Sequence, residues 1–153
     1  GHAVRGLDAT PASTVEHVVD LREHRALAAA CAGVDAIVHT AALHAPHVGV
    51  RSDADFRAIN VDATRALLDA AAAAGVRRIV YTSTTALYGD AATPHGRAGW
   101  VDEDTAPAPV TIYHRSKLAA EDLLVDGAMQ GGPAVRIIRM SRCFPEPAPV
   151  MAA

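Results

Sequence analysis

The chain has 153 residues, of which half are apolar and a fifth are charged, a composition typical of one globular domain with a buried core. Its formal net charge of −3 and the lack of a membrane-length apolar stretch exclude nucleic acid and membrane from the expected partners. Two cysteines, Cys31 and Cys143, exclude a disulfide framework and favour a cytoplasmic location. Because the chain starts at Gly1 rather than Met, we also expect a segment upstream.

Apolar runs of strand type alternate with helical patterns along the chain, which predicts parallel βαβ units. In chain order, the predicted elements are strand Ala3–Leu7, strand Val15–Val19, helix Arg22–Ala32, strand Ala36–His39, helix Asp53–Ala74, strand Arg77–Thr82, helix Ile112–Asp126 and strand Ala134–Arg139.

The helix Asp53–Ala74 has the clearest pattern, because its apolar residues recur at helical spacing. Ser52 can cap its start and Gly75 can end it. The stretch Asp90–Val110 is rich in Gly and Pro and is predicted to be a loop.

The connection between the first two strands is unusual. Only residues 8–14 separate them, whereas a parallel crossover usually takes a dozen residues or more. A hairpin would need a two-residue turn, and Ala9, Thr10, Pro11 and Ala12 do not supply one. We therefore predict an extended return and a parallel pair.

A group of polar residues suggests proton-transfer chemistry. Thr84 follows a predicted strand, and Tyr113 and Lys117 lie one turn apart on a predicted helix. A nearby Lys117 ammonium would lower the pKa of Tyr113 from its usual value of about 10. Tyr113 could then act as general acid or base on a carbinol oxygen, with Thr84 hydrogen-bonding the same oxygen. A Tyr-x-x-x-Lys pattern alone is common, so the main support for a catalytic interpretation is the hydroxyl residue that precedes it.

Six segments in this order resemble one family. They are Gly1–Asp8, Val15–Leu21 with its Asp-Leu end, Val38–Ala42, Asn60–Thr64 (Asn-Val-x-x-Thr), Tyr81–Gly89 (ending Tyr-Gly) and Val135–Arg139. Together they resemble the extended short-chain dehydrogenase/reductases, in particular the NAD-dependent epimerase/dehydratase family that includes UDP-galactose epimerase. The separation of Thr84 from Tyr113 also agrees with that family.

The resemblance implies a doubly wound, Rossmann-like parallel sheet that is incomplete. No Gly-x-x-Gly-x-x-Gly turn occurs, although this turn brings the cofactor pyrophosphate to a helix N-terminus. We therefore expect residues 1–153 to be a partial NAD(P)-binding domain without the first strand and the C-terminal substrate region. Since the first strand is central in the usual order, its absence should separate strands two and three from the others.

The resemblance also implies cofactor contacts, and NAD is expected rather than NADP. Asp8 would bind the adenosine ribose hydroxyls and repel a 2′-phosphate, and no Arg follows to accept that phosphate. Asp20 and Leu21 would contact adenine, although Asp20 could also cap a helix. The remaining cofactor-side residues are expected to be Thr40, Ala41, Ala42, Asn60, Tyr113 and Lys117, with Lys117 on the ribose and Asn60 ordering the site.

Two positions depart from the family pattern. His44 stands where UDP-galactose epimerase has a Lys, and Arg142 stands where the family has an Asn near nicotinamide and substrate. The second departure makes a smaller or acidic substrate an alternative to a nucleotide sugar. His39, His44 and His47 lack a carboxylate or Cys to complete a zinc set, so no metal is expected.

The resulting functional hypothesis is an NAD-dependent epimerase, dehydratase or dehydrogenase that acts on a sugar or another secondary alcohol. Thr84, Tyr113 and Lys117 would be its catalytic residues. The alternative is a non-catalytic dinucleotide-binding regulator or scaffold, which the missing Gly-rich turn favours. Expected partners are a small-molecule substrate, with a nucleotide sugar as the first candidate, and a second copy of the chain in a homodimer.

Overall fold

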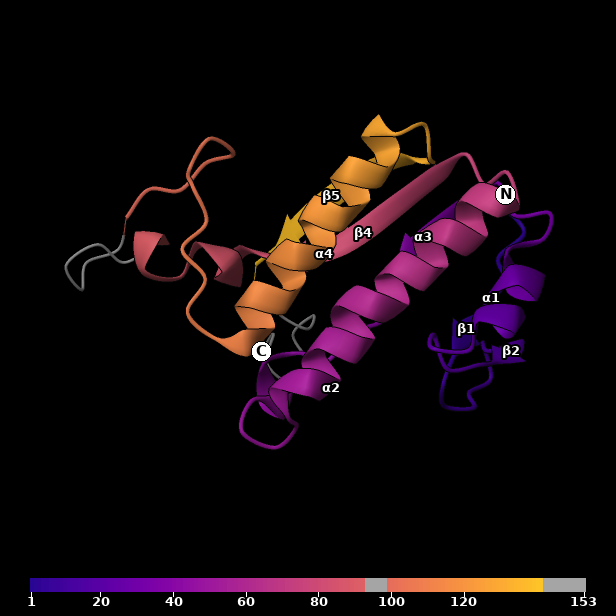
Figure 1. The fold of residues 1–153 in the computed structure, drawn as a ribbon, viewed down its shortest axis with the longest axis horizontal. Coiled ribbons are helices and arrows are strands. Elements are labelled where there is room, and N and C mark those ends of the chain that lie inside the picture. The colour runs from indigo at the N-terminus through magenta and orange to yellow at the C-terminus, as the bar shows by residue number, and fades with distance from the viewer. Residues whose placement is uncertain (93–98, 142–153) are drawn as a thin grey trace, which may run out of the picture.

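The computed structural model describes residues 1–92 and 99–141 and has two parallel sheets (Figure 1). One sheet pairs β1 (Leu7–Asp8) with β2 (His17–Val18), and the other has the order β3 (Ala36–His39), β4 (Arg78–Thr84), β5 (Ala134–Met140). The predicted α/β class with parallel strands is confirmed. The predicted separation of the first two strands from the other three is also present.

The β1–β2 pair is parallel, as predicted, and its register pairs Leu7 with His17. The carbonyl oxygen of Gly6 accepts hydrogen bonds from Glu16 N (2.9 Å) and His17 N (3.0 Å). A Cβ at Gly6 would collide with the carbonyl oxygen of Thr14, so glycine permits this close return of the chain. Both strands are shorter than predicted because the ladder involves only these few residues.

Helices cover one face of the larger sheet. Figure 1 shows α3 and α4 lying along each other in front of β4 and β5, with α1 beside α3. The helices are α1 (His24–Cys31), α2 (Asp53–Arg57), the π-helical turn η2 (Ala58–Asp62), α3 (Ala63–Ala73) and α4 (Ile112–Met129).

The core lies between this helical layer and the sheet. Ile79, Tyr81 and Ser83 alternate along β4 and are all buried. The apolar members pack with Leu27 of α1 and Leu124 of α4 in one cluster. The opposite face of the sheet is open, with Val38 69% and Ile138 49% exposed.

Several predicted boundaries change. The helix predicted at Asp53–Ala74 is α2, η2 and α3 in succession, and its π-helical turn was not predicted. The predicted caps are confirmed, since Ser52 Oγ accepts from Asp55 N and Gly75 has φ +73°. Strand β4 continues to Thr84.

Helix α4 also runs further than predicted. It includes Gly127, whose missing side chain leaves room for Leu68 of α3. Two 3₁₀ segments lie between the predicted helices and strands: η1 (Ala45–His47) and η3 (Thr85–Ala92), which is kinked at Gly89 and enters the predicted loop at Asp90.

Candidate active site

Lys117 is a buried charged residue of the candidate site. Its side chain is buried, its Nζ donates a 2.6 Å hydrogen bond to the Thr82 carbonyl oxygen, and Nζ lies 4.0 Å from the centroid of the Tyr81 ring. Burial lowers the pKa of Lys117 to about 8, opposed by the charge of Glu121 one turn further along α4. The ammonium is thus tied to β4 two residues before Thr84.

Thr84 and Tyr113 lie on two elements that contact each other, β4 and α4. Thr84 is the last residue of β4, and its Oγ1 accepts a hydrogen bond from Ala86 N (3.1 Å). Tyr113 lies in the first turn of α4 and packs on a small cluster with Phe56 and Leu43. Within residues 1–92 and 99–141, no hydrogen bond joins the side chains of Thr84, Tyr113 and Lys117 to one another.

Local sequence explains why α4 starts where it does. Thr111 caps the helix by accepting from His114 N (3.3 Å), and the His114 ring bonds back to the Thr111 backbone. This reciprocal capping begins the helix at Ile112. Tyr113 and Lys117 consequently share one helical face, as the sequence predicted.

Asn60 connects three segments around the site. Its side-chain amide accepts from Leu43 N (2.7 Å) and donates to the Leu43 carbonyl (2.9 Å) and to Ser116 Oγ (2.9 Å). Ser116 Oγ in turn donates to the Tyr113 carbonyl (3.0 Å). The buried Asn60 lies in the π-helical turn η2, a distortion often found at functional sites. Asn60 is buried, as expected, while its role in ordering the site stays a prediction. Its bond to Ser116 was not predicted.

His39 is a buried neighbour of Lys117. Its Nε2 is 2.9 Å from Thr64 Oγ1, and its ring centroid is 5.3 Å from that of Tyr81. Burial, with a smaller effect of the Lys117 charge, lowers the pKa of His39 to about 4. His39 is therefore neutral at pH 7 and adds no charge beside the ammonium.

A second polar network lies one turn beyond Lys117 along α4. Arg139 of β5 binds both carboxylate oxygens of the buried Glu121, at 2.7 to 3.2 Å. Its third nitrogen donates to Tyr88 Oη (3.0 Å), which donates to the Asp102 carbonyl (3.1 Å). The network ties α4 to β5 and to η3, directly after Thr84. None of these residues was predicted, because their partners are distant in sequence.

Several residues predicted to contact the cofactor lie at or just after the ends of strands. Asp8 ends β1, is exposed and accepts from Thr10 N (2.7 Å). Thr40 and Ala41 follow β3 and are exposed, and Ala42 is half-buried. Each lies just beyond or at the carboxyl end of a parallel strand, where ligands of open α/β sheets bind.

Asp20 forms an ion pair with Arg22. Hydrogen bonds from the Arg22 side chain and backbone lower the pKa of Asp20 to about 2. The alternative of Asp20 as a helix cap is wrong, since the N-cap of α1 is Glu23. Leu21 is half-buried and packs on the core.

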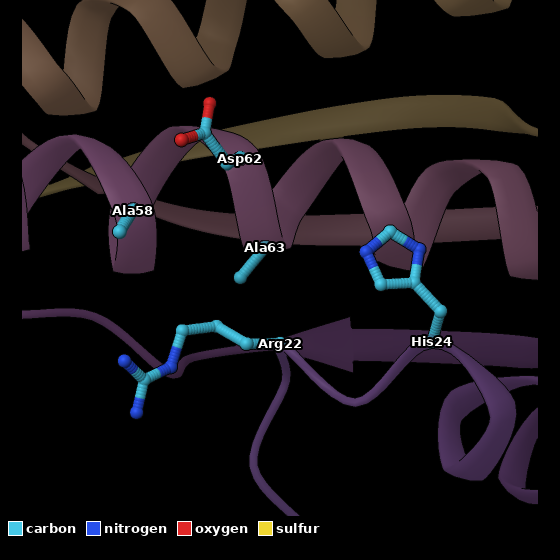
Figure 2. Close-up of a pocket in the computed structure, with 5 residues that line it drawn as sticks. All are labelled: Arg22, His24, Ala58, Asp62 and Ala63. Carbon is cyan, nitrogen blue, oxygen red and sulfur yellow. The ribbon is translucent and has the colours of Figure 1, made fainter.

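A shallow pocket of about 240 Å³ lies next to this pair (Figure 2). Arg22 and His24 line one side, and Ala58, Asp62 and Ala63 of the long helix line the other. In Figure 2 the Asp62 carboxylate points away from the Arg22 guanidinium. Two alanines thus form part of the helical wall of the pocket, opposite the ion-paired Arg22.

Two further observations concern other classes of function. Among the described residues, no group of His, Cys, Asp and Glu could hold a metal ion, and no helix is long and apolar enough to cross a bilayer. Arg142, the predicted departure near nicotinamide, lies outside the described residues.

Comparisons with known proteins agree with this architecture. A model of the NAD dependent epimerase/dehydratase family matches residues 1–147. UDP-glucose 4-epimerase of Rhizobium meliloti is 36% identical over 104 residues, which are 68% of this chain and 30% of that protein. The chain spans about a third of the length of the curated relatives it matches.

Solved structures show the same fold. A short-chain dehydrogenase/reductase superfamily protein from Agrobacterium tumefaciens with bound NAD is 35% identical, with a TM-score of 0.71 over 88% of this chain and 40% of that one. A double mutant of DesIV, a dTDP-glucose 4,6-dehydratase from Streptomyces venezuelae with NAD bound, is 31% identical, with a TM-score of 0.73 over 83% of this chain and 38% of that one.

Proposed function

Because the chain belongs to the NAD-dependent epimerase/dehydratase family, we propose that it contributes the proton-transfer residues of an NAD-dependent enzyme acting on a secondary alcohol of a sugar. The observation that carries the proposal is the contact of Lys117 Nζ with the Thr82 carbonyl, 2.6 Å apart. This contact ties the helix bearing Tyr113 to the end of the strand bearing Thr84.

In the proposed reaction, Tyr113 accepts the hydroxyl proton of the substrate while the carbinol carbon loses a hydride. Thr84 hydrogen-bonds the same oxygen and orients it. Lys117 favours the phenolate of Tyr113 by its charge and binds the ribose hydroxyls. NAD, when bound, supplies the hydride acceptor.

The chain's own residues fit this cofactor. The Asp8 carboxylate is exposed at a strand end and can accept hydrogen bonds from the two ribose hydroxyls. Thr40 and Ala41 are small and exposed, so a bound cofactor can lie close to the protein backbone at these residues. Asp20 and Leu21 directly precede Arg22, which lines the pocket, and this supports their proposed contact with adenine. NAD is preferred over NADP because Asp8 would repel a 2′-phosphate.

The substrate we propose is a nucleotide sugar. Relatives include UDP-glucose 4-epimerase, and one similar structure is a complex with UDP-glucose and NAD. A cytoplasmic location and a homodimer remain predictions, and light scattering of the purified protein would test the second.

The test is an assay of the purified protein with NAD⁺ and a panel of UDP- and dTDP-sugars and simple secondary alcohols. Products are separated chromatographically, because an epimerase returns the hydride and leaves no net NADH. Conversion of a sugar nucleotide supports the proposal. NAD binding without conversion of any substrate would favour the alternative of a non-catalytic dinucleotide-binding regulator.

A further inference from the structure

Lys117 is the single lysine of the chain, and its side chain is only 2% exposed. A buried ammonium is costly unless polar groups replace its water. The Thr82 carbonyl supplies one such contact at 2.6 Å. Among the described residues this carbonyl is the one hydrogen-bond acceptor of Nζ, so contacts other than hydrogen bonds also bear on the stability of the ammonium.

The nearest acidic residue is already paired. Glu121 lies one turn along α4 from Lys117, but Arg139 occupies both of its carboxylate oxygens. The group that faces the ammonium is instead the Tyr81 ring, whose centroid is 4.0 Å from Nζ. The negative face of an aromatic ring attracts a cation, and the attraction grows when water is excluded.

We propose that Tyr81 is a positioning residue for Lys117: the face of its ring and the Thr82 carbonyl together hold the ammonium at the carboxyl end of β4. The inference rests on the proposed function, in which Lys117 acts beside Tyr113. It gives the residue at position 81 a role in the site although Tyr81 is 1% exposed and reaches no substrate.

The ring, and not the hydroxyl, is the active part of Tyr81. The Tyr81 hydroxyl is buried without a hydrogen-bond partner among the described residues. The ring also lies against His39, at 5.3 Å between centroids, and His39 is itself bonded to Thr64. Ring and hydroxyl can therefore be separated by substitution, because Phe keeps the face and removes only the hydroxyl.

The experiment is a titration of Lys117 followed by NMR. Growth with ¹³C-lysine labels this one residue, so its Cε shift reports the ammonium without ambiguity. The titratable groups that face it are Glu121 and Tyr113 on α4, His39 on β3 and Tyr81 on β4. Tyr81→Phe should leave the titration midpoint within about 0.3 pH unit, whereas Tyr81→Leu should lower it by about one pH unit.

Because Tyr81→Leu also alters packing, a series of ring-fluorinated phenylalanines at position 81 serves as the control. Replacing Tyr81 by phenylalanines with increasing ring fluorination keeps the shape and weakens the negative face, so the midpoint should fall stepwise. A midpoint that stays constant or rises along this series overturns the proposal, as does a fall in Tyr81→Phe equal to that in Tyr81→Leu. The titration needs neither NAD nor substrate, so its outcome is independent of whether the proposed reaction is found.

Discussion

Arg139 and Glu121 form a bidentate ion pair across the packing of β5 on α4, with nitrogen–oxygen distances of 2.7 to 3.2 Å. Glu121 has 4% of its side chain exposed and Arg139 has 26%. Glu121 is one turn beyond Lys117, and Arg139 also holds Tyr88 after Thr84. The pair thus links α4, which carries Tyr113 and Lys117, to β5 and, through Tyr88, to the segment that follows Thr84.

The first prediction concerns the contribution of this ion pair to the free energy of unfolding. Arg139→Met should lower the free energy of unfolding by about 3–5 kcal/mol, because it leaves a buried carboxylate without a partner. The double variant Arg139→Met/Glu121→Leu should recover most of the loss, since it removes the stranded charge. Urea unfolding measures both. The exposed Arg136→Met on the same strand is the matched control, and a double variant no more stable than Arg139→Met would contradict the account.

Two buried tyrosines should respond oppositely to the same substitution. The Tyr81 hydroxyl has no hydrogen-bond partner within residues 1–92 and 99–141, so Tyr81→Phe should leave stability unchanged or raise it by up to about 1 kcal/mol. The Tyr88 hydroxyl bonds Arg139 and Asp102, so Tyr88→Phe should cost about 1–3 kcal/mol. Thermal unfolding of the two variants side by side checks the difference. Equal effects of the two substitutions would show that the two hydroxyls do not differ in their hydrogen bonding.

His39 should make stability depend on pH. Burial lowers the pKa of His39 to about 4 in the folded chain, compared with about 6.5 when unfolded. The folded state therefore binds fewer protons between these values, so stability is full above about pH 6.5 and falls as pH drops toward 4. The loss approaches about 1.4 kcal/mol per pH unit at its steepest.

The measurement for His39 is a set of urea unfolding curves across this pH range. His39→Gln, which can still bond Thr64, should flatten the dependence, while the exposed His2→Gln should not. An unchanged slope in His39→Gln would show that another group is responsible.

Asp8 should set the choice of dinucleotide. Asp8→Ala should weaken NAD binding more than NADP binding, because it removes both the ribose acceptors and the charge that repels a 2′-phosphate. Binding of both cofactors is compared by calorimetry with that of the wild type, with the exposed Asp69→Ala as control. A wild type that binds NADP more tightly than NAD would refute the assignment.

The sequence predicted the parts of the fold that depend on local pattern. Ser52 and Gly75 bound the long helix as expected, and the helical spacing of Tyr113 and Lys117 is observed. The parallel β1–β2 pair was also predictable, because the connecting residues cannot form a two-residue hairpin. Boundaries that depend on packing were missed. Gly127 stays inside α4 because Leu68 occupies the space of its absent side chain.

The site itself could be predicted only in part. Thr84, Tyr113, Lys117 and Asn60 were proposed from spacing and resemblance, and their roles stay predictions. The surroundings that determine their behaviour were not predicted, since Lys117 meets Thr82 across 35 residues and Arg139 meets Tyr88 across 51. Such contacts arise from the packing of α4 on the sheet, and no local pattern records them.

The most direct test of the proposed function is the turnover of Tyr113→Phe on the sugar nucleotide that the wild type converts. Loss of the phenol should reduce turnover by about two to four orders of magnitude, the usual contribution of a general acid or base. NAD affinity should barely change, because the phenol acts on the substrate. Turnover close to the wild-type value would contradict the assignment of Tyr113 and, with it, the proposed mechanism.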